Sequence, residues 1–420
     1  MSAMSSNWDR RSLFKAAAGL AAAGTLAACG SNNGRSDSGG SGTNLTQFFH
    51  AYGEAGTEQA IKKYAAAYDK AKVNTQWITG SDFESKLFAT LLTKNAPDLF
   101  EFHPQIQLVK SGQVADLTDI IDPVKDDFNP ADIKSHTVDG KIYGVRMIDD
   151  PQFFFYRPSL LEKAGVKVPT TLDELIEAAA KLTTSKVKGL FLGNDLHAVI
   201  NPMIWSAGAD TLDDKNQIAY HTDGVIEGIK KMRTLFTSGD LLLDAPADYW
   251  DASALNQGLC AMQFCGMWAM PQFQQTLGDD IGVFPFPKVT DSGKPSVYNG
   301  GWSMFVNAKG ENVEAAKAYV KWLWLDQKTY QEDWATSYGF HIPPRTSIAA
   351  SATKLKSGLP AEGVKLFTDY GHFDNIGWTQ AMITALEDVF ANSVRKGGDP
   401  EASLDKADKT VNRELKKLFG

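Results

Sequence analysis

Strand-like and helical stretches alternate along the first part of this chain, and this order constrains the fold more than any other feature of the sequence. The pattern of apolar and β-branched residues predicts strands at 45–50, 73–78 and 98–102, with helices at 58–72 and from Ser81 to Asn95. A βαβαβ order predicts a parallel sheet covered by helices, which is an α/β fold.

Polar side chains follow the ends of these expected strands. Ligands of parallel sheets gather beyond the carboxyl ends of the strands, and those ends carry Tyr52, Asp82 and Glu101, flanked by His50 and His103. The carboxylates are candidate acceptors for ligand hydroxyl groups. Asp82 has a structural alternative, because an acidic residue in a first helical turn also favours the helix dipole. The two histidines are more often structural than ligand-binding at such positions.

The rest of the chain continues the alternation. We expect strands at 138–147, 152–156, 189–192, 259–264, 281–287 and 304–307, and helices at 171–182, 225–236, 311–334, 378–393 and 400–418. Capping boxes at Ser81/Glu84 and Thr171/Glu174 mark two helix starts. With 420 residues, the chain is long enough for two lobes.

The net charge of −8 argues against a nucleic-acid partner. Three cysteines are present, and Cys260 and Cys265 are five positions apart in a strand-like run. This odd separation places them on opposite strand faces, so we expect two small buried residues and no disulfide. The spacing does not fit a zinc site. No metal and no cofactor are therefore predicted.

The N-terminal residues predict export and lipid anchoring. Arg10-Arg11 precedes a mild apolar run from Ala16 to Ala28, which is too short and weak for a permanent membrane span. Small residues then lead to Cys29. The whole stretch resembles a bacterial lipoprotein signal of the twin-arginine type, with residues 1–28 as signal peptide and Cys29 as the lipidated residue. Residues 29–44 include a Gly/Ser-rich run that predicts a flexible tether.

Two tryptophans follow glycine-bearing turns. Trp268 comes after Gly266-Met267, and Trp302 comes after Asn299-Gly300-Gly301. An indole beside glycine can leave a flat face open, and such a face suits the C–H surface of a sugar. The alternative from the residues alone is that both indoles belong to the core.

Six motifs in order carry a family resemblance. They lie at 96–100 (APDLF), 139–145 (DGKIYGV), 155–165 (FYRPSLLEKAG), 258–268 (GLCAMQFCGMW), 299–307 (NGGWSMFVN) and 339–345 (GFHIPPR). Together they resemble the family 1 extracellular solute-binding proteins, which serve ABC importers, mostly for carbohydrates. Two departures stand out: Arg157-Pro158 replaces the family's usual Asn-Lys, and Arg146 stands where the family usually has proline.

The resemblance implies a two-lobe, periplasmic-binding-protein-like fold of type II, with a hinge and a ligand cleft between the lobes. It implies an N-terminal lobe of residues 45–150 and 303–325 and a C-terminal lobe of residues 153–299 and 327–420. The chain is expected to cross between the lobes near Pro151, Gly301 and Asp326. Closure around a ligand is then a hinge motion.

The resemblance also implies aromatic platforms at Trp268, Trp302 and Trp378. With the polar groups at strand ends and loops, the expected ligand-binding residues are Tyr52, Asp82, Glu101, Asp149, Asp150, Trp268, Asn299, Gly301, Trp302, Arg345 and Trp378. Some have plainer roles open to them. Asp149-Asp150 before Pro151 can form a simple turn, and Arg345 can form a structural salt bridge.

The expected function is that of a substrate-binding lipoprotein, which captures an oligosaccharide by aromatic stacking and polar contacts and delivers it to the permease subunits of an ABC importer. We expect a monomer outside the cytoplasm, attached only by its lipid to the outer face of the bacterial cytoplasmic membrane. A peptide or polyamine binder is the alternative, and an adhesin or scaffold is a weaker one. A secreted glycoside hydrolase is also weaker, because the sequence lacks GxSxG, HExxH and phosphate-loop motifs.

Overall fold

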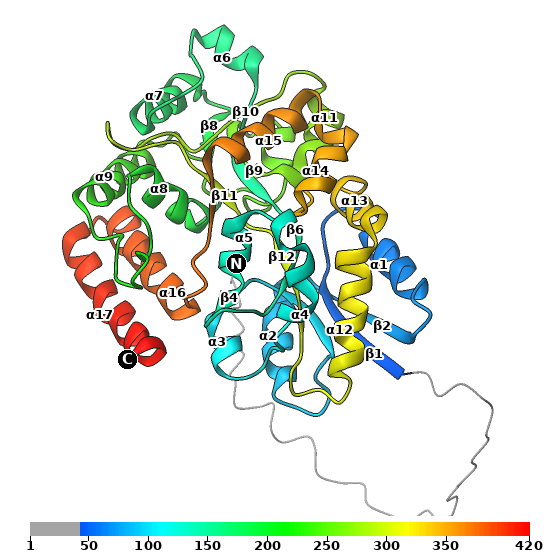
Figure 1. The fold of residues 1–420 in the computed structure, drawn as a ribbon. Coiled ribbons are helices and arrows are strands. Elements are labelled where there is room, and N and C mark those ends of the chain that lie inside the picture. The colour runs from blue at the N-terminus through cyan, green and yellow to red at the C-terminus, as the bar shows by residue number, and fades with distance from the viewer. Residues whose placement is uncertain (1–42) are drawn as a thin grey trace, which may run out of the picture. The chain divides into compact units, whose positions relative to one another are not determined.

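The computed structural model describes residues 43–420, which form one compact unit. The expected signal peptide, Cys29 and nearly all of the tether lie outside the described residues. Two large β-sheets organise the described chain, and Figure 1 shows each sheet with its own helices. The α/β class predicted from the sequence is confirmed.

The first sheet has the strand order β2-β1-β3-β12-β6. Its strands are β1 (Thr43–His50), β2 (Ala71–Ile78), β3 (Leu99–Phe102), β12 (Trp302–Val306) and β6 (Val145–Ile148). β1 pairs in parallel with both β2 and β3, as the βαβαβ order predicted. β12 arrives from much later in the chain and runs antiparallel to β3 and β6.

Alternating residues of the first sheet build two separate cores. Phe49 and Leu99 pack on the side of α1 (Thr57–Ala66) and α12 (Val313–Lys321). Phe48 and Phe100 pack on the side of α2 (Gly80–Leu91). Since successive side chains of a strand point to opposite faces, a strand buried on both faces is mostly apolar, and its buried polar residues, Gln47 in β1 and Glu101 in β3, make hydrogen bonds.

The second sheet has six strands, in the order β13-β11-β7-β9-β8 with β10 paired to β7. They are β13 (Gly371–Phe373), β11 (Val297–Asn299), β7 (Pro151–Tyr156), β9 (Cys260–Gly266), β8 (Lys188–Phe191) and β10 (Gly282–Phe284). β7 lies at the centre and pairs antiparallel with β9, β10 and β11. The small pair β4 (Thr137–Val138) and β5 (Lys141–Ile142) stands apart.

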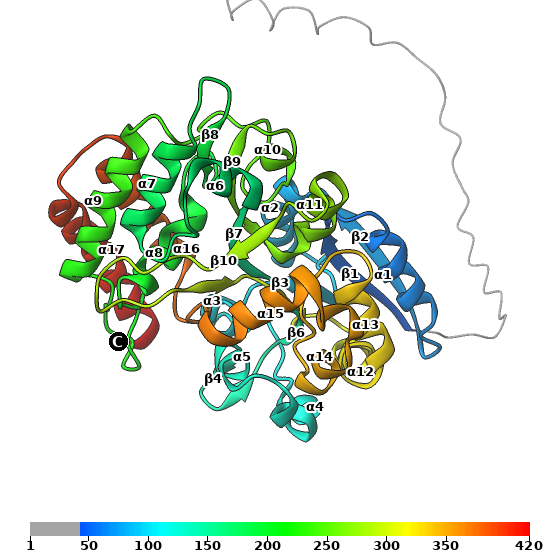
Figure 2. The ribbon, with the colours of Figure 1, turned by 90° about the horizontal axis from the view of Figure 1, so that it is seen from above.

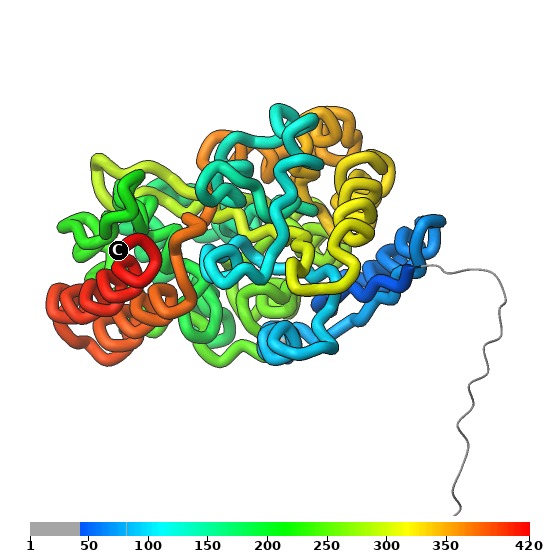
Figure 3. The backbone as a smooth tube through the Cα atoms, turned by 60° about the horizontal axis from the view of Figure 1, so that its bottom comes forward, coloured from blue at the N-terminus to red at the C-terminus, as the bar shows by residue number. Residues whose placement is uncertain are grey.

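Helices cover both faces of the second sheet, as Figure 2 shows from above. Phe154 packs with helices α7 (Leu172–Leu182), α8 (Ile200–Ser206), α9 (Asp223–Thr237) and α16 (Gln380–Val389). Phe153 and Phe155 face α10 (Ser253–Asn256), α11 (Met270–Leu277) and α15 (Gly358–Tyr370). α17 (Pro400–Phe419) packs against α16 and α9, and Figure 3 shows these C-terminal turns in red beside the green α9 segment.

Further elements connect these layers. They are α3 (Ile106–Lys110), α4 (Thr118–Ile121), η1 (Asp122–Asp127), α5 (Pro130–Ser135), α6 (Pro158–Ala164), η2 (His197–Val199), η3 (Met267–Ala269), η4 (Trp322–Asp326), α13 (Lys328–Thr336), α14 (Thr346–Ser351), η5 (Thr353–Leu355) and η6 (Phe390–Arg395). Within residues 43–420, no helix combines the length and the apolar character needed to cross a bilayer.

Several local predictions are confirmed and others are corrected. The capping box of Thr171 and Glu174 is present, and Cys260 and Cys265 are free and buried. The helix expected from Ser81 instead begins at Gly80 with Thr79 as its N-cap, so the predicted box at Ser81/Glu84 is wrong. The first helix ends at Ala66, because the chain turns there to enter β2.

A further correction concerns the expected helix at 311–334, which is broken into α12, a π-helical turn and α13. Trp324, within the π-helical turn, and Trp334, in α13, both enter the core of the first sheet. The break turns the chain so that both indoles reach the same core. Leu92, within the expected helix, is 84% exposed, because α2 ends at Leu91.

Candidate functional site

The chain passes between the two sheets at two adjacent places. β6 leads into β7 through Asp149 and Asp150, while β11 leads into β12 through Gly300 and Gly301. The two passages are neighbours because β11 pairs with β7 at one end and β12 pairs with β6 at the other. We name these two linkers, residues 149–150 and 300–301, the crossing.

Gly301 is required by the geometry of the crossing. Its φ of +57° lies in the left-handed region, and a Cβ there would stand 2.5 Å from the carbonyl oxygen of Ile148 and 2.7 Å from Nη1 of Arg146. Real Cβ atoms do not approach other atoms so closely, so a side chain fits neither the backbone conformation nor the space. The role of Gly301 shown here is conformational.

A buried polar network holds the crossing together. The Asn299 amide Nδ2 donates to Asp149 Oδ1 at 2.7 Å, and the Asp150 backbone N–H donates to Asn299 Oδ1 at 2.9 Å. Arg146 donates to the Gly300 carbonyl at 3.1 Å and to Asp132 at 2.9 Å. The structure thus brings together four of the expected site residues, Asp149, Asp150, Asn299 and Gly301, but their polar atoms bond to one another.

The charges of this network shift its pKa values. Burial, together with the nearby Asp132 carboxylate, raises the pKa of Asp149 to about 7, although Arg146 and the Asn299 hydrogen bond oppose the shift. On the other side, the imidazole of His341 contacts Asp150 through Nδ1 and lies 3.2 Å from Glu54 through Nε2. Burial disfavours its charge, but the two carboxylates outweigh that effect and raise the pKa of His341 to about 10.

A third chain segment, which contains Ile342, lies beside the two linkers of the crossing. Its backbone exchanges hydrogen bonds with Asp149, at 2.9 and 3.0 Å. Trp334 and Ala335, only a few residues earlier, are buried in the core of the first sheet. His341 and Ile342 therefore connect α13, whose residues Trp334 and Ala335 lie in the first core, to the linker of residues 149–150.

Trp302 begins β12 and lies among aromatic rings at the ends of β1 and β3. Its ring centroid is 4.1 Å from that of His50, at an interplanar angle of 25°, and 4.3 Å from that of His103. The indole keeps part of its surface exposed. Burial lowers the pKa of His103 to about 4, so this ring is neutral near pH 7.

Tyr52 and Glu101 complete this cluster, as predicted from their places at strand ends. The Tyr52 hydroxyl donates to Glu101 Oε2 at 2.8 Å, and His50 Nδ1 lies 2.6 Å from Oε1. Burial, followed by the Glu101 charge, raises the pKa of Tyr52 well above its usual value. Because Glu101 is fully buried, it acts in this structure by orienting Tyr52 and His50.

Trp378 lies in a different place, at a pocket of about 160 Å³ beside the second sheet. Its wall combines aliphatic residues of η2, α8 and α16 with aromatic and hydrogen-bonding side chains: Asn201, Tyr249, Tyr298, Asp374, Trp378 and Glu387. The Tyr298 hydroxyl and the Asn201 amide donate to Asp374 at 2.6 and 3.1 Å. Trp378 itself is only 4% exposed, so it offers the pocket a small part of its indole.

The remaining expected residues are not in these clusters. Asp82 is exposed in the first turn of α2. Arg345 is buried and donates to Asp127 at 2.7 Å and to the Leu325 carbonyl at 3.0 Å, which is the structural salt bridge considered from the sequence. Trp268 packs over Gly266, where a Cβ would stand 1.8 Å from the indole, and donates to the Trp250 carbonyl at 3.0 Å.

Sequence reasoning missed Tyr249, Tyr298, Asp374 and Glu387. Tyr298 had a usable signal, since it directly precedes the Asn-Gly-Gly turn. Asp374 follows a short strand-like run, which is a weak signal. Tyr249 comes from a loop and Glu387 from an amphipathic helix, and no local pattern separates either from ordinary surface residues.

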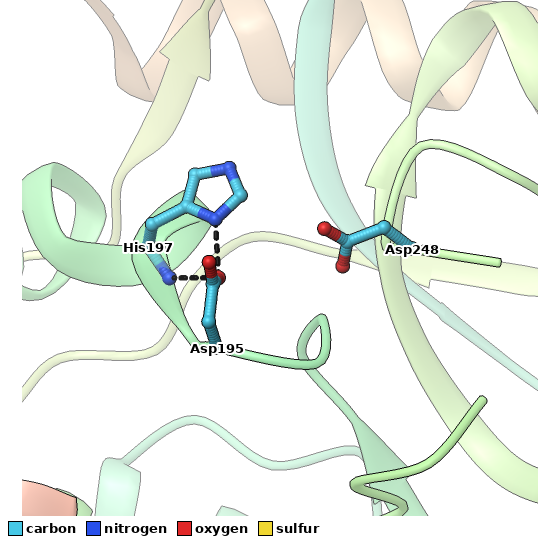
Figure 4. A group of neighbouring side chains, drawn as sticks. All are labelled: Asp195, His197 and Asp248. Atoms are coloured by element: carbon cyan, nitrogen blue, oxygen red, sulfur yellow. Dashed lines mark hydrogen bonds and ion pairs between the residues drawn. The ribbon is translucent and has the colours of Figure 1, made fainter. Parts of the chain in front are cut away.

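Two groups of side chains in the described residues have metal-ligand spacing. One is Asp195, His197 and Asp248, drawn in Figure 4, and the other is His221, Glu401 and Asp405. In the first, Asp195 is occupied by the ring and backbone N–H of His197, and Asp248 Oδ1 accepts from two backbone N–H groups at 2.8 and 3.0 Å. These bonds explain the group without an ion.

The model of the family described as bacterial extracellular solute-binding protein matches residues 50–327. An arabinooligosaccharide-binding protein of Halalkalibacterium halodurans is 24% identical over 247 residues, 56% of this chain and 55% of that protein. The diacetylchitobiose binding protein DasA of Streptomyces coelicolor is 25% identical over 315 residues, 72% of each chain. These relatives are binding proteins rather than enzymes.

Solved structures share the fold. The GacH receptor of Streptomyces glaucescens, solved unliganded and with acarbose, aligns with a TM-score of 0.77 and 23% identity over 89% of this chain and 99% of its own. Maltose-bound MalE3 of T. maritima aligns with a TM-score of 0.74 and 19% identity over 88% and 99% of the two chains. At this identity the likeness establishes the fold alone.

Proposed function

The chain belongs to the bacterial extracellular solute-binding protein family, and on that premise we propose that it captures an oligosaccharide and delivers it to the permease of an ABC importer. Relatives named for binding arabinooligosaccharides and galactooligosaccharides support this ligand class. The match spans little more than half of the first of these relatives, at 55% of its length. The ligand and the permease partner are therefore proposals for this chain.

One observation carries the proposal, which is the make-up of the pocket at Trp378. Neutral sugars present C–H faces and hydroxyl rims, and they bind where aromatic rings lie beside convergent acceptors and donors. The pocket combines Tyr249, Tyr298 and Trp378 with Asn201 and Asp374. The partly exposed rings of Trp302 and Tyr52 supply a second aromatic surface, on the first sheet.

We propose that each sheet with its helices forms one lobe and that the crossing is the hinge. Residues 45–150 and 303–325 then belong to the N-terminal lobe, and residues 153–299 belong to the C-terminal lobe. The resemblance also gave residues 327–420 to the C-terminal lobe, but Trp334 is buried in the first core, so we propose that residues 327–341 belong to the N-terminal lobe and that the third passage lies near Ile342. Of the eleven expected ligand-binding residues, Tyr52, Trp302 and Trp378 keep the strongest support.

The family is extracellular, so the protein acts outside the cytoplasm. We further propose that residues 1–28 are a lipoprotein signal peptide, that Cys29 carries the lipid, and that a monomer is tethered through residues 29–44. We also propose a binder without enzymatic activity, as in the named relatives.

A thermal-shift screen tests the ligand class. Mono- and oligosaccharides are compared with peptides and polyamines, and one sugar class is expected to raise the melting temperature. A ligand at a hundredfold excess over Kd adds about 2.7 kcal/mol to stability. Chromatography of the released sugar should recover it intact. No shift with any sugar, or a shift only with peptides or polyamines, would overturn the proposal, and cleaved sugar would favour a glycoside hydrolase.

A further inference from the structure

The pocket at Trp378 is acidic. Its wall carries the carboxylates of Asp374 and Glu387, and no lysine or arginine lines it. Neither carboxylate has an ion-pair partner within 4.0 Å among residues 43–420. The only basic side chain in the wall is His197, which is already in contact with Asp195.

The two carboxylates differ in the number of hydrogen bonds that they accept. Asp374 accepts hydrogen bonds from two neutral donors, Tyr298 and Asn201. Glu387, one turn of α16 beyond Ile383, is half-buried and accepts no side-chain hydrogen bond within the described chain. Burial raises the pKa of both carboxyl groups, because their charges have lost water without gaining an ion-pair partner within 4.0 Å in the described chain.

Neighbouring charges do not neutralise the pocket. Arg146 is the cation that acts most on Asp374, but its guanidinium is held by Asp132 at 2.9 Å. Near Glu387, His197 opposes the shift while Asp195 and Asp388 reinforce it. Asp248 adds a further carboxylate beside the His197 loop, as Figure 4 shows.

We propose that this pocket selects a carbohydrate that carries a protonated amino group, with Glu387 and Asp374 as the acceptors of the ammonium. This inference rests on the proposed function and narrows its substrate class. A hydroxyl can also donate to a carboxylate, but only an ammonium adds the attraction between opposite charges, which is stronger beside a partly buried carboxylate than in bulk water. An ammonium also restores to Glu387 the counter-charge that its half-buried position lacks.

Pairs and sets of sugars that differ only in the group at one position, a hydroxyl, an amine or an acetamide, test the inference. Glucose and glucosamine, galactose and galactosamine, and the β-1,4-linked trimers of glucose, glucosamine and N-acetylglucosamine are titrated calorimetrically at about pH 6, where such amines are protonated. The amino member of the best-bound series is expected to bind about tenfold tighter than its neutral counterparts, which is about 1.4 kcal/mol. The preference should weaken with added salt.

Glu387→Gln should weaken binding of the amino sugar about tenfold more than binding of its neutral counterpart, so that most of this preference is lost. Asp388→Asn is the matched control, because it removes the same charge from an exposed position of the same helix. Neutral sugars that bind as tightly as amino sugars would overturn the inference and leave the proposed function standing. If Glu387→Gln keeps the preference for the amino sugar, the assignment of Glu387 as an acceptor of the ammonium is wrong.

Two further results separate the alternatives. If calcium or zinc alone raises the melting temperature and EDTA abolishes sugar binding, the acidic wall holds a metal ion and the ammonium assignment is wrong. If no neutral or amino sugar shifts the melting temperature in the larger screen, the proposed function itself fails. Binding of an amino sugar that Glu387→Gln weakens and EDTA leaves unchanged supports the inference.

Discussion

The side chain of Asn299 bonds to both residues of the neighbouring linker at once, giving a hydrogen bond to Asp149 at 2.7 Å and accepting one from the Asp150 backbone at 2.9 Å. All three residues are buried. Asn299→Ala therefore leaves a buried carboxylate without its amide donor and a buried N–H without its acceptor. Each unsatisfied group costs about 1–3 kcal/mol.

We expect Asn299→Ala to lower the free energy of unfolding by about 3 kcal/mol in urea titrations. Asn95→Ala is the control, because Asn95 is exposed and its side chain makes no hydrogen bond within the described residues. Equal stability of the two variants would show that the network at the crossing contributes little.

Gly301→Ala should be more damaging than its backbone conformation alone explains. The left-handed conformation costs an alanine about 1–2 kcal/mol, and the close approach to Ile148 and Arg146 adds steric strain. Gly140 has a φ of +76° but open space where a Cβ would stand. We expect chemical denaturation to show a loss of about 1–2 kcal/mol for Gly140→Ala and about 3 kcal/mol or more for Gly301→Ala. Equal losses would contradict the steric argument.

The sequence predicted most of the architecture because the layers are encoded locally. Adjacent apolar residues in 45–50 and 98–102 mark strands that are buried on both faces, and the confirmed parallel pairing of β1 with β2 and β3 follows from their order. The break between α12 and α13 is harder to predict from the sequence. It depends on tertiary packing, because Trp324 and Trp334 are buried in the same core.

The candidate site was only partly predictable. Tyr52, Glu101 and Trp302 lie at strand ends, so sheet topology alone places them together. Asn299 and Asp149 are 150 positions apart, and their mutual bond appears only when the linkers are side by side. Asp374 and Glu387 stand out because no residue of the described chain forms an ion pair with them, and a missing partner leaves no mark in a sequence.

His341 makes the stability of the protein depend on pH. Its pKa rises from 6.5 to about 10 because Asp150 and Glu54 face it, although burial opposes this. A group with a raised native pKa contributes stability that is complete below about pH 6.5 and is lost as the pH rises toward about 10. We expect the free energy of unfolding to fall by up to about 1.4 kcal/mol per pH unit in that window.

His341→Gln should flatten this decline in urea titrations between about pH 7 and 10. His103→Gln is the control, since the pKa of His103 is lowered to about 4 and the ring is neutral in both folded and unfolded chains over that window. An unchanged slope in His341→Gln would mean that His341 does not hold the extra proton.

Cys29→Ala tests the lipid anchor. Lipid chains hold a protein on the membrane by burying their methylene groups, so removal of the acceptor thiol should move the protein from the membrane fraction to the soluble extracytoplasmic fraction. Cys260→Ala is the matched control, because that thiol is buried in β9 and should leave the distribution unchanged. Membrane retention of the Cys29 variant would contradict anchoring through this residue.

Trp302→Ala tests the aromatic surface on the first sheet. The indole stacks on His50 and lies beside His103 while part of it remains exposed. An aromatic contact contributes about 0.5–1.5 kcal/mol beyond its buried area, so we expect the Kd for the bound sugar to rise about threefold to tenfold in calorimetry. Trp322→Ala is the control, since Trp322 packs beside Tyr319 and Tyr330 instead. An unchanged Kd in a Trp302 variant that folds with the parent's circular dichroism would remove Trp302 from the site and leave the pocket at Trp378 as the aromatic surface to test.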